Sequence, residues 1–233
     1  MPRFYMAIPR FLGFVGREII NVNSILVKTK YLKFMQENSQ PLSVLTQLFK
    51  VGIDRADIML ETISRSPIKL KLLSVDLFPP QQLPMQLEKH LGAKDLKAVE
   101  MVFSGEFQGN TQLIFGKQTA SILIDLIESE DRRKLDKGAF EKAIFSEVGN
   151  IFYNGIMGVI STLCEYGITY MIPKYKEGDL RSILLGNLSP KYSVALIGTI
   201  EIFRDRNLVF WFQFDSLEKL LEKSHNLEDY FDV

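Results

Sequence analysis

The chain has 233 residues, of which 46% are apolar and 24% are charged, and its 28 basic and 28 acidic side chains give a formal net charge of zero. This composition is typical of a folded globular protein with room for one large domain or two small fused units. The balanced charge gives no support to a nucleic-acid-binding function, which usually requires a basic excess.

Few side chains in the sequence are suited to metal or redox chemistry. The single cysteine, Cys164, cannot form an intrachain disulfide, as expected for a protein of the reducing cytoplasm. Two histidines, His90 and His225, together with one thiol are too few for a His/Cys zinc site. A Cys-His nucleophilic pair would require Cys164 to meet a histidine that is distant in sequence. We therefore expect no metal site and no cofactor-binding site.

Residues 1–40 form a basic N-terminal extension, in which six basic side chains face only two acidic ones. Arginines interrupt each apolar run, so the segment does not resemble a signal peptide. Two interpretations stay open. The segment is either an additional helix packed on the domain with its charges in water, or a basic surface that makes weak contact with anionic lipid or an acidic partner.

The rest of the chain predicts a duplicated unit. The elements expected in residues 41–128 are a long helix running into a strand (48–78), a proline-rich loop (79–84), a β-hairpin (97–115) and a short helix (118–128). Residues 137–224 repeat this order with a helix and strand (145–174), a hairpin (192–211) and a short helix (216–224). The long-helix blocks align without a gap when Gly52 is laid on Gly149. Residues 129–136 link the halves, and residues 225–233 form an acidic tail.

A single copy of this unit has too few strands to bury its apolar faces, so the two copies are expected to share one sheet. The predicted fold class is α/β: a pseudo-twofold, mainly antiparallel sheet with two long helices packed on it. The apolar stretch 150–172 approaches the length of a membrane span. Asn150, Asn154 and Glu165 make it a poor one, and the sequence predicts a buried amphipathic helix followed by a strand, with no transmembrane span.

The second long helix carries a polar stripe beside an apolar one. Helical spacing places on the polar stripe Ala143, Glu147, Asn150 and Asn154, and on the apolar stripe Ile144, Val148, Ile151 and Val159. A Glu-x-x-Asn pair alone is typical of any solvated helix surface. Here a Val-Gly pair lies inside it, Pro173 follows Asn150 after twenty-two residues, and the whole block is duplicated.

These residues resemble the CheC/CheX/FliY phosphatases of bacterial and archaeal chemotaxis. The signature of that family is Asp or Ser, three residues, Glu, two residues, Asn, twenty-two residues and Pro. Glu147, Asn150 and Pro173 stand at this spacing, and the similarity covers roughly residues 41–224.

The chain departs from the family pattern in two respects. Ala143 occupies the first signature position, where the family has Asp or Ser. Phe152 and Tyr153 stand where small residues are common in the family. Side chains of this size are expected to crowd the surface that a partner approaches.

The resemblance implies a hydrolase that removes the phosphoryl group from the aspartate of a phosphorylated CheY-like response regulator. Asn150 would orient the attacking water, because a carboxamide can donate and accept hydrogen bonds without adding negative charge. Glu147 would bind a lysine of the regulator, and Ala143 and Asn154 would complete the docking surface. The phosphorylated aspartate and its Mg²⁺ would both come from the partner.

The first half of the chain lacks these side chains. The gapless alignment puts Thr46, Lys50, Ile53 and Asp76 at the positions of Ala143, Glu147, Asn150 and Pro173. This half is therefore expected to be catalytically inactive. It would be retained because the shared sheet needs its packing. The alternative function is a noncatalytic CheC-like scaffold that binds a response regulator, a CheD-like protein or a flagellar-switch component.

Overall fold

The computed structural model describes residues 39–64, 67–106, 108–127, 136–163, 167–188, 194–203, 206–215 and 220–221. Several predicted features lie outside the described residues. These are residues 1–38 of the N-terminal extension, Cys164 and His225, most of the linker 129–136, all but two residues of the closing helix 216–224, and the acidic tail 225–233.

One antiparallel sheet with helices packed on it confirms the predicted α/β fold class. The described strands are β1 (Lys71–Phe78), β2 (Leu96–Gly105), β3 (Gly109–Phe115), β4 (Ile168–Tyr170), β5 (Lys174–Gly178), β6 (Val194–Phe203) and β7 (Arg206–Phe214). They form a seven-stranded sheet in the order β1-β6-β7-β3-β2-β4, and β5 also pairs with β2. All of these pairings are antiparallel.

The strand order shows how the two halves share the sheet. The single strand of the first half, β1, pairs with the hairpin strand β6 of the second half. Conversely, β4 and β5 of the second half pair with β2 of the first. The two hairpins meet in the middle of the sheet, where β3 pairs with β7. Each half therefore completes the sheet of the other, which explains why neither copy could bury its apolar faces alone.

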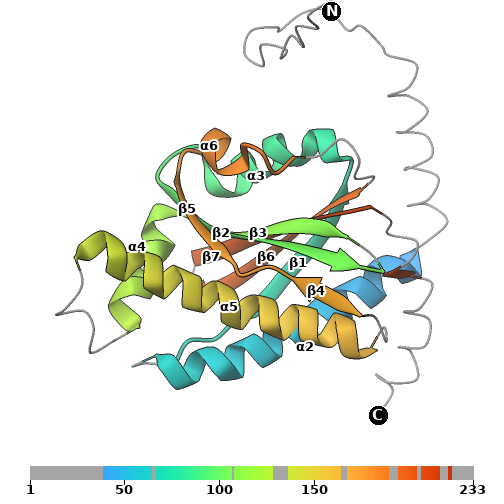
Figure 1. Ribbon diagram of the computed structural model, residues 1–233, viewed down its shortest axis with the longest axis horizontal. Coiled ribbons are helices and arrows are strands. Elements are labelled where there is room, and N and C mark those ends of the chain that lie inside the picture. The colour runs from blue at the N-terminus through green and yellow to red at the C-terminus, as the bar shows by residue number, and fades with distance from the viewer. Residues whose placement is uncertain are drawn as a thin grey trace, which may run out of the picture. The chain divides into compact units, whose positions relative to one another are not determined.

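The two long helices, α2 (Ser39–Ile63) and α5 (Lys137–Leu163), lie side by side on one face of this sheet (Figure 1). Between helices and sheet lies a cluster of aromatic rings. The Phe210 ring of β7 contacts Phe49 of α2 and Phe152 of α5, with centroids 5.2 Å and 5.4 Å apart. These side chains are almost fully buried, so the rings fix both helices to the same strand.

Short helices cover the opposite face of the sheet (Figure 1). They are the 3₁₀ turn Pro80–Gln82, α3 (Leu83–Leu91) and α6 (Leu180–Leu184). The last two pack around the buried Trp211. The prediction of a loop after Pro79 is wrong here, because Pro84 stands in the first turn of α3, where its missing N–H removes no helical hydrogen bond. Asp179 caps α6 by accepting a hydrogen bond from the Ser182 N–H at 2.7 Å. The helix predicted over 118–128 is α4 (Lys117–Leu126).

Helix α5 is long and apolar enough to cross a membrane by length and composition alone. In the structure, 67% of its most apolar window is buried inside the protein. It packs against α2, β2 and β5, and its apolar side chains are used in that packing. Such burial is typical of the core helix of a folded domain, so the helix is weak evidence for a membrane span.

The backbones of α2 and α5 come into direct contact at two glycines. A β-carbon added to Gly52 would lie 2.7 Å from the Ile156 Cα, and one added to Gly155 would overlap the carbonyl oxygen of Gly52. Side chains larger than hydrogen at these positions would push the helices apart. Another glycine of α5, Gly158, has open space where a β-carbon would stand.

This contrast predicts opposite effects of one substitution at two positions of α5. Gly155→Ala should destabilise the fold by about 1–3 kcal/mol, because backbone atoms of α2 must move. Gly158→Ala should stabilise it by up to about 1 kcal/mol, because alanine favours the helix and meets nothing there. Denaturant titration of both variants measures the free energies of unfolding. Equal effects of the two substitutions would contradict the close helix contact.

Candidate functional site

The predicted polar stripe lies on the outer side of α5. Ala143, Glu147 and Asn154 are exposed, and Asn150 is partly exposed. Glu147 and Asn150 are three positions apart and therefore neighbours on the helix surface. Among the described residues, neither of these two side chains has a hydrogen bond or ion pair. The carboxylate and the carboxamide are accordingly accessible to a second molecule.

The inner side of α5 explains why this stripe faces out. Ile144, Val148 and Ile151 are buried, as the predicted apolar stripe requires. Between Glu147 and Asn150 stands Gly149, where an added β-carbon would overlap the Val99 side chain of β2. The glycine thus brings the helix close to the sheet at the very turn that carries the two polar residues.

Phe152 and Tyr153 do not crowd the outer surface, contrary to one expectation from the sequence. Their side chains are only 2% and 1% exposed. Phe152 packs on Phe210, and the Tyr153 hydroxyl donates a hydrogen bond to the Val99 carbonyl oxygen at 2.6 Å. Burial raises the pKa of Tyr153 above its usual value, so the hydroxyl stays protonated as a donor. Both residues hold α5 on the sheet.

The strand segment that contains Pro173 runs along the same helix. The Tyr170 hydroxyl donates a hydrogen bond to Asn154 Oδ1 at 3.0 Å, and the Tyr175 ring stacks on Phe145 with centroids 5.8 Å apart. Asn150 lies between Phe145 and Asn154 on the helix, and Pro173 lies between the two tyrosines, in the connection from β4 to β5. The two contacts therefore hold the segment from β4 to β5 alongside α5, and Figure 1 shows both strands next to this helix.

The corresponding positions of the first half have different surroundings. Lys50 is exposed and forms an ion pair with Asp54 at 2.7 Å. Ile53, at the position of Asn150, is fully buried. The Thr46 hydroxyl donates a hydrogen bond to the Leu42 carbonyl oxygen within α2. Asp76 lies in β1 and pairs with Ile197 of β6. The structure thus assembles the stripe on α5 and offers no equivalent of it on α2.

Comparisons with known proteins agree with this architecture. No protein-family model and no curated protein matches the sequence. Among solved structures, FliY from Thermotoga maritima superposes with a TM-score of 0.60 at 13% identity, covering 82% of this chain and 98% of that chain. The FliM middle domain from H. pylori gives 0.58 at 16% identity, covering 80% and 99%. CheX from Desulfovibrio desulfuricans gives 0.51 at 13% identity, covering 72% and 99%.

The chain has the CheC/CheX/FliY fold. At these identities the comparison establishes the fold alone. In this CheC-like fold, the Glu147 and Asn150 stripe occupies the outer face of one of the two long helices. Among the described residues, no group of three or more His, Cys, Asp or Glu side chains could hold a metal ion.

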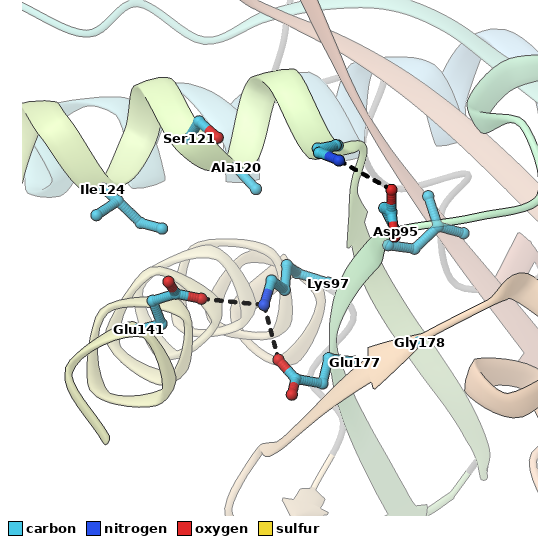
Figure 2. A pocket seen from close by; sticks show the side chains of 10 residues that line it. Asp95, Lys97, Ala120, Ser121, Ile124, Glu141, Glu177 and Gly178 are labelled. Carbon is cyan, nitrogen blue, oxygen red and sulfur yellow. Dashed lines mark hydrogen bonds and ion pairs between the residues drawn. The ribbon is translucent and has the colours of Figure 1, made fainter. Parts of the chain in front are cut away.

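A second polar feature of the CheC-like domain was not predicted from the sequence. A cleft of about 490 Å³ lies between α4, the start of α5 and the β2-β5 strand pair. Figure 2 shows Lys97 at its base between Glu141 and Glu177, with Nζ to Oε2 distances of 3.0 Å and 2.7 Å. Burial would lower the pKa of Lys97, but its hydrogen bonds to Glu177, Glu141 and Tyr175 outweigh burial and raise it.

The Lys97 cluster links three elements that are far apart in the sequence. Desolvation and the hydrogen bond to Glu177 raise the pKa of Tyr175 to about 12, while the hydrogen bond to Lys97 opposes them. The pKa of Glu177 is lowered by its hydrogen bonds to Lys97 and Tyr175. Because the Lys97 ammonium bridges a carboxylate of α5 and one of β5, the cluster acts as a brace that fixes the start of α5 to the sheet.

The orientation of Tyr153 gives a test of how α5 is held. Tyr153→Phe should lower the free energy of unfolding by about 1–2 kcal/mol, because the Val99 carbonyl loses a buried donor. The matched control is Tyr170→Phe, whose exposed hydroxyl should contribute less than about 0.5 kcal/mol. Both values come from denaturant titration. A Tyr153→Phe protein as stable as the wild type would refute the buried hydrogen bond.

Proposed function

We propose that the protein is a phosphatase that hydrolyses the aspartyl phosphate of a CheY-like response regulator. One observation carries the proposal: Glu147 and Asn150 lie side by side on the accessible face of a helix whose inner face is fully packed. A rigid helix can present both side chains to a second protein without rearranging. The similarity to FliY and CheX structures is consistent with this function.

Asn150 has the chemistry needed to position water. Hydrolysis of an acyl phosphate passes through a loose transition state, so that catalysis rests on alignment of the nucleophile and on charge stabilisation. The carboxamide oxygen accepts a hydrogen bond from the water, and its NH₂ group donates to the water or to a phosphoryl oxygen. Because the group is neutral, it adds no repulsion beside the phosphoryl oxygens.

Glu147 is suited to docking. Its carboxylate would be repelled by the phosphoryl oxygens, so its favourable partner is a lysine of the regulator, one helical turn away from the water held by Asn150. In this proposal the phosphorylated aspartate and its Mg²⁺ belong to the regulator. The protein would meet such a regulator in the cytoplasm. At the first signature position, the small Ala143 side chain leaves space for the regulator.

A noncatalytic scaffold is the second candidate function. The specific observation in its favour is that the FliM middle domain from H. pylori matches the fold about as well as FliY does, and FliM is also found in solved complexes with FliG and with SpeE. Ala143, in place of an Asp or Ser, removes one polar group from the stripe. The scaffold would bind a regulator, a CheD-like protein or a flagellar-switch component without turnover.

The water-positioning role predicts the effect of Asn150→Ala. Loss of orientation should slow phosphate release from a cognate phosphorylated regulator by about tenfold or more. Release of inorganic phosphate from the labelled regulator measures this rate. Lys50→Ala, on the other long helix, is the control and should keep the wild-type rate. If phosphate release is unaffected by wild-type protein while the regulator still binds, the scaffold is the correct function.

The docking role predicts a different kinetic signature for Glu147. Glu147→Ala should raise KM for the phosphorylated regulator while kcat changes little, because the lost interaction exists before the transition state. Glu147→Lys should raise KM further through repulsion of the regulator's lysine. Steady-state phosphate release over a range of regulator concentrations separates the two constants. A selective loss of kcat would instead assign Glu147 to the reaction itself.

A further inference from the structure

Three consecutive apolar side chains protrude beside the Asn150 stripe. Tyr170 is 43% exposed, Met171 is 56% exposed and Ile172 is 87% exposed. We call these three residues the apolar corner. It borders the stripe directly, because the Tyr170 hydroxyl donates its hydrogen bond to Asn154. Polar stripe and apolar corner therefore form one continuous surface.

The sequence around Pro173 accounts for the exposure of the corner. Strand β4 ends at Tyr170, which pairs with Phe103, and β5 resumes at Lys174, which pairs with Glu100. Between these pairs, three residues of one strand oppose two of the other, so one residue cannot fit the ladder. Met171 still donates its N–H to the Val102 carbonyl oxygen at 2.9 Å, whereas Pro173 has no N–H to donate. Ile172 is left outside the pairing.

The duplicated fold supplies an internal comparison. The equivalent segment of the first half is residues 73–76 of β1. This strand also has an irregularity, between Leu72 and Ser74, but its pairing with β6 continues to Phe78. Val75, at the position of Ile172, is only 6% exposed. The fold can therefore bury an apolar residue at this position, and the second half does not.

The polar stripe alone offers little affinity for a partner. An exposed ion pair such as the one proposed for Glu147 contributes weakly, and stable interfaces depend on a few apolar side chains that become fully buried. The corner provides such side chains on the flank of the stripe formed by β4 and β5. The other flank of the stripe is occupied by α2, whose backbone is in contact with α5 (Figure 1).

We propose that the apolar corner is the docking anchor for the phosphorylated regulator, with Ile172 inserted into an apolar depression next to the regulator's acyl phosphate. This inference rests on the proposed function and adds the kind of surface that the regulator must have. The matching face of the regulator combines a lysine for Glu147, the phosphoryl group for Asn150 and an apolar pocket for Ile172. Binding then depends mainly on the corner, with Glu147 orienting the docked regulator, and turnover depends on Asn150.

The test compares Ile172→Ser with Leu185→Ser. Leu185 is a matched control, because it is 76% exposed and lies in the turn after α6, away from α5. The probes are the receiver domains encoded in the same genome, trapped in the active state with beryllium fluoride for binding and phosphorylated for turnover. Ile172→Ser should keep the wild-type unfolding midpoint, because the side chain is almost fully exposed.

The expected result is a Kd and a KM raised roughly tenfold or more by Ile172→Ser with kcat unchanged, since truncation of a buried anchor acts on binding. Leu185→Ser should match the wild type in all three constants. If a receiver domain binds the wild type and Ile172→Ser equally well, the corner is not in the interface and the inference falls, while the proposed function stands. If no receiver domain binds or is dephosphorylated, both fall.

A second copy of this chain is the competing occupant of the corner, because β4 and β5 lie at an edge of the sheet. Sedimentation velocity of wild type and Ile172→Ser distinguishes the two cases. A dimer that Ile172→Ser dissociates, with unchanged affinity for the receiver domain, would assign the corner to self-association and overturn the inference.

Discussion

The contact between two helix backbones at Gly52 and Gly155 sets α5, the helix that carries the residues of the polar stripe, directly against α2. Because α2 and α5 touch there, both long helices fit on one face of the sheet, and the Phe210 ring can pack against each of them. Gly149 brings α5 equally close to β2. With one flank occupied by α2 and the inner face filled by aromatic rings, only one stripe of α5 stays accessible. The packing therefore selects which polar residues can meet a partner.

Much of the fold could be predicted because the sequence is duplicated. Alternating apolar residues on both sides of a polar turn gave the hairpins, and two helix-strand blocks aligned at Gly52 and Gly149 gave the shared sheet. The helices of the opposite face were missed for physical reasons. Helix α6 is only five residues long, too short for a periodic pattern. Pro84 stands in the first turn of α3, where proline is compatible with a helix, but the cluster of three prolines indicated a loop. Pro173 is a local signal for the break between β4 and β5, but the position of the break also depends on pairing with β2.

The stripe of the candidate site followed from helical spacing alone, since residues three and four positions apart must share a face. The side-chain orientation of Phe152 could have been inferred in the same way, because it lies four positions after the buried Val148. Tyr153 lies three positions after Asn150, and its burial depends on the contact with Val99 of the sheet. The size of both side chains was a misleading signal. By contrast, the hydrogen bond from Tyr170 to Asn154 and the brace of Lys97 with Glu141 and Glu177 join residues from separate elements. Such contacts depend on the complete tertiary structure, so the sequence gives no indication of them.

The two halves show how one fold can separate packing from recognition. At the position of Asn150 the first half has Ile53, which is fully buried, and at the position of Asn154 it has Asp57. Asp57 accepts a hydrogen bond from the Leu70 N–H at 2.7 Å and pairs with Lys69, so its carboxylate is committed to holding β1 near α2. Helix α5 is held instead by the ion pair between Glu141, in its first turns, and Lys97 of β2. This ion pair and the Tyr153 hydrogen bond hold α5 on the sheet. The Glu147 and Asn150 side chains are therefore not needed for packing and stay available to a partner.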